Sequence, residues 1–304
     1  MPIAAITGAT GYIGRFVAAE LHRLGFDLRA LARPDSDRSG FQVPIEWLIG
    51  DMQTASALDQ LVAGASAVVH LAYTHVPGRY RGGEGDNLPG WLAANLYGSL
   101  ALIQAAQQAG VERFIFLSSR AVFSRTEPGR DLDESHPPTP DTHYGAYKVA
   151  VEAFLNSTAA LSAMRTFSVR ATGVYGLTWP PARSKWWPII QAVRQATAVD
   201  MFTAGGTEVY GGDVARLIGL LLTDPTLRPI AGVDIVHLSD LVVTGRDVVQ
   251  IARQISGRAG TLPAEPATIP ANPLVCRRIA ELGFTLGGRS ALEAAIAELI
   301  AAVH

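Results

Sequence analysis

Three glycines near the start of the chain, Gly8, Gly11 and Gly14, have types and spacing suited to binding phosphate. The apolar segment Ile3–Thr7 predicts a buried strand before them, and apolar spacing predicts a helix over Tyr12–Leu24. In such a unit the first glycine permits a tight turn, the second lets a pyrophosphate approach, and the third lets the helix pack closely. The helix N-terminus adds N–H groups and a partial positive charge. The turn therefore predicts a dinucleotide site, and three further residues are expected to contact the ligand: Thr10, Tyr12 and Ile13.

The end of the second predicted strand, Leu28–Ala32, indicates which dinucleotide binds. An acidic side chain here grips the adenosine ribose of NAD, but this strand is followed by Arg33. Arg33, assisted by Arg38, is suited to pair with a 2′-phosphate, which favours NADP. In the alternative, Arg33 is an ordinary surface residue, and Asp35 or Asp37 holds the ribose of NAD.

Tyr144 and Lys148 are a candidate acid–base pair. They lie four residues apart at the start of a predicted helix, Tyr144–Leu161, and so share one helix face. A tyrosine ordinarily has a pKa of about 10, which is too high for an efficient base near neutral pH. The positive charge of a neighbouring lysine favours the phenolate and lowers that pKa. The spacing alone is also common on plain helix surfaces.

These residues need a framework, and strands alternate with helices along much of the chain. The alternation predicts an α/β fold with a Rossmann-type, doubly wound parallel sheet. Further strands are predicted at 45–49, 67–72, 113–118 and 166–170, and a long helix is predicted over Trp91–Ala109.

After residue 240 the pattern becomes mainly helical, which predicts a small, mainly helical C-terminal substrate lobe. We expect residues 1–172 to form a dinucleotide-binding domain to which 207–240 return, with 173–206 and 241–304 in the lobe. The segment Thr178–Pro188, which contains three tryptophans, is expected either to touch substrate or to anchor the lobe.

Composition excludes several other classes. A net charge of −2 gives no reason to expect nucleic acid or an anionic membrane as a partner. The single cysteine, Cys276, forms no internal disulfide, and no cysteine cluster predicts a metal site. We find neither a signal-peptide pattern nor an apolar run long enough to span a membrane. These features favour a cytoplasmic protein that acts on a small-molecule substrate.

Together the motifs resemble the extended short-chain dehydrogenases/reductases of the NAD-dependent epimerase/dehydratase family, in particular its UDP-glucose 4-epimerase-like and NADPH-dependent ketone-reductase-like branches. The similarity runs from the glycine turn to about residue 176. It implies that Tyr144 and Lys148 are catalytic. It also matches Ser119 to the catalytic serine or threonine, and Asn95 to an asparagine that supports an active-site water network. Lys148 would also hold the nicotinamide ribose.

The resemblance also implies cofactor contacts beyond the glycine turn. Asp51 and Met52 resemble the pair beside the adenine. The end of the fourth predicted strand resembles the wall along the ribose and phosphates. The remaining implied contacts are Leu71, Ala72, Tyr73, Tyr144, Lys148, Ala171 and Val174.

Several positions depart from the sugar-nucleotide members of the family. Gly173 stands where they often carry asparagine, and Gly206 stands where they often carry an arginine that grips a diphosphate. The stretch 262–273 also lacks an arginine. These departures argue against a sugar-nucleotide substrate, unless Arg183 or Arg194 supplies the missing charge.

Three functions follow from the resemblance. The first is an NAD(P)-dependent oxidoreductase that moves a hydride between nicotinamide and a hydroxyl or ketone carbon. The second is a nucleotide-sugar epimerase with transient oxidation by bound NAD. The third is a non-catalytic dinucleotide sensor, against which the presence of Tyr144 and Lys148 argues. The resemblance also implies a homodimer, formed by pairing of the two long helices.

Overall fold

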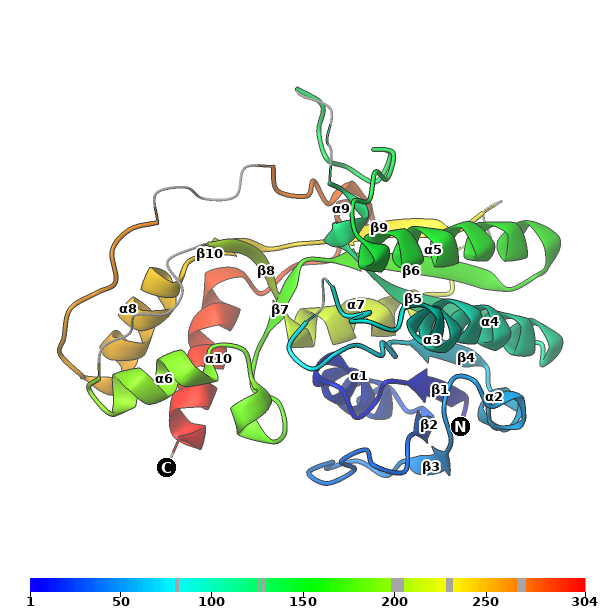
Figure 1. Ribbon diagram of the computed structural model, residues 1–304, viewed down its shortest axis with the longest axis horizontal. Coiled ribbons are helices and arrows are strands. Elements are labelled where there is room, and N and C mark those ends of the chain that lie inside the picture. Colours follow the sequence, from blue (N-terminus) through cyan, green and yellow to red (C-terminus); the bar gives the residue numbers. More distant parts are fainter. Residues whose placement is uncertain are drawn as a thin grey trace.

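A seven-stranded parallel sheet forms the centre of the larger lobe in the computed structural model (Figure 1). The structure describes residues 1–79, 82–124, 126, 129–197, 205–227, 232–266 and 272–303. The strand order is β3-β2-β1-β4-β5-β6-β9, which confirms the predicted doubly wound fold. The strands are β1 (Ile3–Thr7), β2 (Asp27–Ala32), β3 (Glu46–Ile49), β4 (Ala67–His70), β5 (Arg113–Ser119), β6 (Arg165–Ala171) and β9 (Asp234–Leu238).

Both faces of the sheet are buried because alternate strand residues enter two separate cores. In β5, for example, Ile115 faces one core, whereas Phe114 and Phe116 face the other. Helices α1 (Tyr12–Arg23) and α7 (Gly211–Thr223) cover the first face. Helices α2 (Ala55–Val62), α4 (Gly98–Gln108) and α5 (His143–Leu161) cover the second (Figure 1).

The long helix predicted over Trp91–Ala109 is interrupted by a wider turn. It consists of α3 (Leu88–Leu92), the π-helical turn η1 (Ala93–Tyr97) and α4. Such π turns often occur at functional sites. This one contains Asn95.

The smaller lobe combines helices with a three-stranded sheet that the sequence pattern does not predict. Helices α6 (Trp187–Arg194), α8 (Gly245–Ser256) and α10 (Gly288–Ala302) share one apolar core. Trp186 lies in this core and stacks on Tyr175 at a ring-centroid distance of 5.2 Å, so it serves as an anchor. The sheet consists of β7 (Gly173–Tyr175), β8 (Gly206–Tyr210) and β10 (Leu241–Val243).

One C-terminal helix, α9 (Arg277–Glu281), lies apart from the small lobe and packs on β9. Its Ile279 belongs to the core of the large sheet. The division of the chain into two domains at residues 172, 206 and 240 stays a prediction. Within the described part of the chain, no helix has the length and apolarity to cross a membrane.

Candidate active site

The glycine turn lies against the carboxyl end of β4. Gly8 has a φ of +76°, and a Cβ there would lie 2.7 Å from the backbone nitrogen of Ala72. A Cβ at Gly14 would overlap the Gly8 carbonyl and lie 2.6 Å from the Cα of Ala9. No side chain caps the first turn of α1, so its N–H groups face the turn without a side-chain acceptor. The turn thus has the shape and polarity that a pyrophosphate needs.

Ser119, Tyr144 and Lys148 come together at the same edge of the sheet. Ser119 ends β5, and its Oγ accepts a hydrogen bond from the Ala121 amide at the start of the short helix η2 (Arg120–Val122). Tyr144 and Lys148 lie on successive turns of α5. The Lys148 Nζ lies 5.6 Å from the centroid of the Tyr144 ring and donates to the Leu117 carbonyl of β5 at 2.6 Å. This bond joins α5 to the strand that carries Ser119.

Burial changes the proton affinity of Lys148. The side chain is 4% exposed, and loss of solvation lowers its pKa to about 7, although the charge of Glu152 acts in the opposite direction. The ring of Phe116 lies 4.5 Å from Nζ, and the ring of Tyr147 lies at 5.0 Å. A lysine of this kind titrates near neutral pH, in the range where an acid–base site works.

Asn95 holds the loop that follows β4. Its Oδ1 accepts from the Thr74 amide at 2.8 Å, and its Nδ2 donates to the Thr74 and Trp91 carbonyls at 2.9 Å. The side chain is 3% exposed. Its implied role in a water network stays a prediction. Its contacts show that it fixes the backbone beside Tyr73.

Arg33 lies directly after β2, with its side chain 56% exposed and its Nε 3.4 Å from the Asp35 carboxylate. The segment that follows is held by both lobes. Arg15 of α1 donates to the Ser39 carbonyl at 2.7 Å, and Trp179 donates from Nε1 to the Ser39 Oγ at 3.0 Å. Trp179 thus links the small lobe to the segment in which a ribose or 2′-phosphate is expected.

Asp51 and Met52 have structural contacts of their own. The Asp51 carboxylate accepts from the Gln53 amide and the Thr54 hydroxyl, both at 2.9 Å, just before α2. Met52 is buried among the residues of the second core. Their implied place beside an adenine stays a prediction.

The other predicted cofactor residues lie at carboxyl ends of strands. Leu71, Ala72 and Tyr73 follow β4, and the Ala72 amide donates to the Thr7 Oγ1 at 3.3 Å. The Tyr73 ring packs on Tyr144 at a centroid distance of 4.8 Å.

Ala171 ends β6 next to Ser119 of β5. Val174 follows in β7, and Thr10 and Ile13 flank the start of α1. Tyr12 instead turns toward the small lobe, where its hydroxyl donates to the Gly176 carbonyl at 2.7 Å.

A buried polar chain connects these elements, and the sequence pattern missed it. His70 lies 2.6 Å from the Thr7 Oγ1 through Nδ1 and 2.8 Å from the Ser99 Oγ through Nε2. Ser99 in turn lies 3.3 Å from the Tyr147 hydroxyl. Burial lowers the pKa of His70 to about 3, so it is neutral near pH 7. The one available signal was a histidine at the end of an apolar strand.

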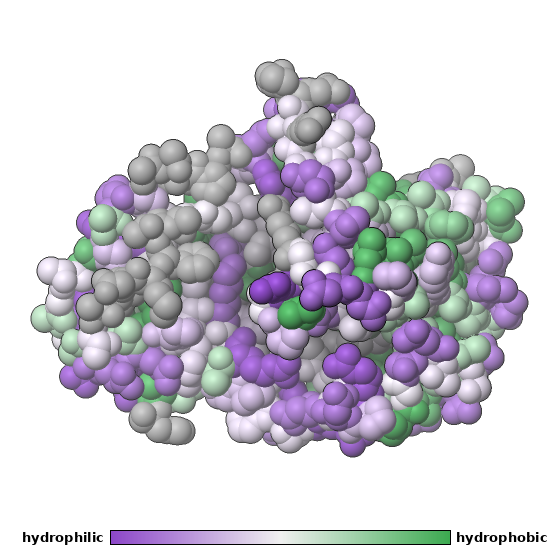
Figure 2. Space-filling view, viewed as in Figure 1, coloured by the Kyte–Doolittle hydropathy of each residue, from purple (hydrophilic) through white to green (hydrophobic). Residues whose placement is uncertain are grey.

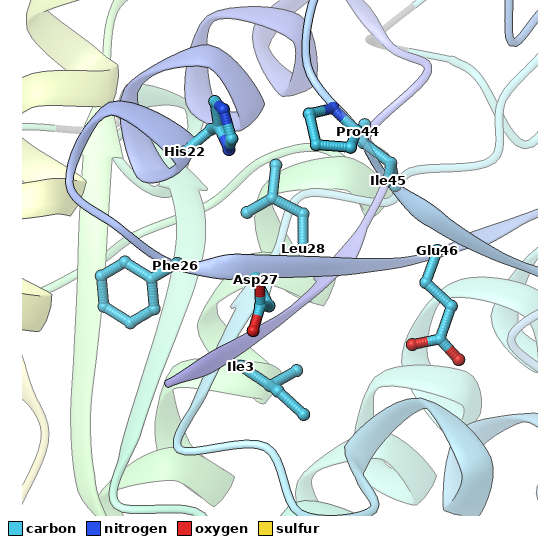
Figure 3. Close-up of a pocket in the computed structure, with 8 residues that line it drawn as sticks. All are labelled: Ile3, His22, Phe26, Asp27, Leu28, Pro44, Ile45 and Glu46. Carbon is cyan, nitrogen blue, oxygen red and sulfur yellow. The ribbon is translucent and has the colours of Figure 1, made fainter. Parts of the chain in front are cut away.

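Two of the hollows on the described surface were compared with the candidate site. One, of about 450 Å³, lies at the amino ends of β1, β2 and β3, away from the candidate site (Figure 3). Ligands of doubly wound sheets bind at carboxyl ends, so this hollow is not the active site. The other, of about 530 Å³, lies at the start of α5 and is lined by Gly82, Glu84, Pro140, Asp141, Thr142, His143 and Ala146.

Comparison with known proteins agrees with the fold. A family model described as "NAD dependent epimerase/dehydratase family" matches residues 4–231. The chain is 31% identical over 144 residues to a putative dihydroflavonol 4-reductase of Synechocystis sp., which covers 47% of this chain and 40% of that protein. The chain therefore spans less than half the length of this relative.

Two further similarities cover more of the chain. It is 29% identical over 272 residues to a ceramide reductase of Caulobacter vibrioides, which covers 88% of this chain and 73% of that protein. Among solved structures, the UDP-glucose 4-epimerase of Thermus thermophilus in complex with NAD matches with a TM-score of 0.77. That match has 21% identity and covers 100% of both chains, so it supports the fold.

Proposed function

The chain belongs to the NAD-dependent epimerase/dehydratase family, and from this premise we propose that it is an NAD(P)-dependent oxidoreductase. It moves a hydride between the nicotinamide and a hydroxyl or ketone carbon of a small molecule. One observation carries the proposal. Ser119, Tyr144 and Lys148 meet at the carboxyl edge of the sheet that also bears the glycine turn. Relatives named as reductases support the same reaction class.

Each residue of the site has a separate role in this proposal. The glycine turn and the first turn of α1 would hold the pyrophosphate, because the N–H groups of that turn have no side-chain acceptor and Gly8 and Gly14 let the turn pack closely against β4 and α1. The dinucleotide supplies a carbon that accepts or donates hydride. Tyr144 exchanges a proton with the substrate oxygen, and Ser119 donates a hydrogen bond to that oxygen as its charge changes. Lys148 stabilises the phenolate form of Tyr144 and would hold the nicotinamide ribose.

NADP is the cofactor that Arg33 favours. Its side chain is 56% exposed directly after β2, the strand that pairs with β1, and is paired only loosely with Asp35, so it is accessible to a 2′-phosphate. NAD stays the alternative, since a protein of the same fold forms a complex with NAD.

The test is Tyr144→Phe, assayed with sugar nucleotides and small ketones in the presence of NADPH or NADH. Loss of the proton-exchanging hydroxyl should lower kcat by about 100-fold or more on every accepted substrate, while cofactor affinity changes little. The matched control is Tyr97→Phe, which removes the hydroxyl of a tyrosine that is 61% exposed. Full turnover by the Tyr144 variant would contradict the mechanism, whereas a wild-type protein that binds the dinucleotide but turns over no substrate would favour a dinucleotide sensor.

The same assay separates the two catalytic alternatives. A UDP-glucose 4-epimerase of Rhizobium leguminosarum bv. trifolii is 26% identical to this chain over 229 residues. A nucleotide-sugar epimerase is therefore the catalytic alternative. A reductase consumes NADPH in proportion to product. An epimerase isomerises its substrate with no net loss of the dinucleotide.

A further inference from the structure

A partly buried ion pair joins Lys185 to Glu208 of β8 in the small lobe. The Lys185 Nζ donates to both carboxylate oxygens of Glu208, at 2.6 and 2.5 Å. The Glu208 side chain is 8% exposed and that of Lys185 is 29% exposed. Burial raises the pKa of Glu208, while the charge of Lys185 opposes that rise. The ammonium and the carboxylate therefore neutralise each other in a poorly solvated position.

The location of the pair follows from its neighbours. A Cβ on Gly173 would lie 2.8 Å from the Glu208 Cδ, so the carboxylate rests on the backbone of β7. Gly173 comes two residues after Ala171, which pairs with Ser119 across β5 and β6. On its other side, Lys185 donates from its backbone N–H to the hydroxyl of Tyr12, the first residue of α1. The pair thus lies where β7 and β8 of the small lobe meet the start of α1.

The charges of the pair balance each other. The hollow at the start of α5 has Glu84, Asp141 and His143 and, among its described lining residues, no lysine or arginine. The charge of Arg183 acts on Arg15 and Asp37, which places it toward the segment after β2. A diphosphate or carboxylate entering here would have to compete with Glu208 for Lys185.

We propose that Glu208, by neutralising Lys185, selects substrates whose non-reacting part is uncharged and carries hydroxyl or carbonyl groups. The inference rests on the proposed function only in taking this region as the substrate site. The pair offers such a substrate a hydrogen-bond donor and acceptors without net charge. It disfavours anions because Glu208 occupies the ammonium and repels them.

The experiment measures binding of UDP to the NADPH-loaded protein by calorimetry at low and high salt. Glu208→Gln keeps the shape of the side chain and removes its charge, so it should tighten UDP binding about tenfold, an effect that salt weakens. The double variant Lys185→Met with Glu208→Gln should lose the gain. The control is Glu293→Gln, which releases Arg289 from an exposed ion pair on α10 and should leave UDP binding unchanged.

The UDP affinities of the variants test the proposed role of Glu208. Unchanged UDP affinity in the Glu208 variant, or a gain that persists without Lys185, overturns the proposal. Unaltered NADPH affinity shows that the variants are folded, and Lys185→Met alone gives a second reading, because it should not tighten UDP. None of these measurements depends on hydride transfer, so the Tyr144 variant tests the proposed function separately.

Discussion

At the scale of single residues, burial sets the chemistry of the candidate site. Lys148 is buried among aromatic rings and donates to the Leu117 carbonyl, and its pKa falls to about 7. His70 is neutral near pH 7 for the same reason and serves as a fixed hydrogen-bonding link. The site thus keeps one group, Lys148, near its titration midpoint at neutral pH. The geometry fixes its distance to Tyr144.

The low pKa of Lys148 predicts a pH dependence of stability. Between pH 7 and 9 the unfolded chain keeps the lysine proton, because its pKa is near 10.4, while the folded protein loses it. The unfolded state then binds more protons, so the free energy of unfolding should rise with pH, by about 2 kcal/mol over this range. Lys148→Met should remove most of that rise, as measured by urea denaturation of the cofactor-free protein.

Other groups contribute less over this pH range. Burial raises the pKa of Cys276 to about 11, so its opposing contribution begins near pH 8, as the unfolded thiol ionises, and is smaller than that of Lys148 up to pH 9. The titration of His70 changes the free energy of unfolding mainly below pH 6.5. An equal rise in the wild type and in the Lys148 variant would assign the effect to another group.

At the scale of elements, the turn between β1 and α1 places the helix N-terminus. α1 packs on α7, and its Gly14 has no room for a side chain against Gly8 and Ala9. The π turn plays a comparable part on the other core, because it directs Asn95 to Thr74 and Ser99 to His70. Both features position backbone at the carboxyl edge of the large sheet, where the cofactor is proposed to bind.

Gly14→Ala should therefore weaken NADPH binding by about tenfold or more, because the added Cβ displaces the turn from α1. The control is Gly110→Ala. Gly110 has a positive φ, +72°, and faces open space, so the change costs about 1 kcal/mol of stability and leaves NADPH affinity intact. Fluorescence titration with NADPH and thermal unfolding measure the two effects. Equal NADPH affinity in the Gly14 variant and the wild type would rule out the proposed role of the turn.

At the scale of the whole molecule, one outer face is apolar. Figure 2 shows hydrophobic residues gathered over α4 and α5, on the right of the view. Large apolar side chains are exposed there: Tyr97 is 61% exposed, Phe154 50% and Leu161 80%. Such a face favours association of two copies through these helices.

We propose a homodimer formed through this face and expect a dimer mass by light scattering. Phe154→Glu places a charge in the interface and should shift the protein toward monomer. The control is Ile255→Glu, which alters an apolar residue of the small lobe that is 44% exposed and should leave the dimer intact. A monomer mass for the wild-type protein would contradict the proposed homodimer.

The sequence by itself determined the features that depend on short-range geometry. The glycine turn needs only three glycines between a strand and a helix, and Tyr144 and Lys148 need only the spacing of one helical turn. Apolar periodicity likewise determined the alternation of strands and helices that became the seven-stranded sheet.

Only the tertiary structure decided which distant residues meet. The Thr7–His70 contact joins residues 63 positions apart, Asn95 reaches Thr74 across 21, and Lys185 reaches Glu208 across 23. These polar groups carry no local periodicity, and their partners follow from how helices and strands pack. Chain packing also decided that Trp186 is an anchor and that the helix predicted over Trp91–Ala109 contains a π turn. The cofactor turn could be predicted because its chemistry is local, whereas the substrate side required the fold because its charges pair across it.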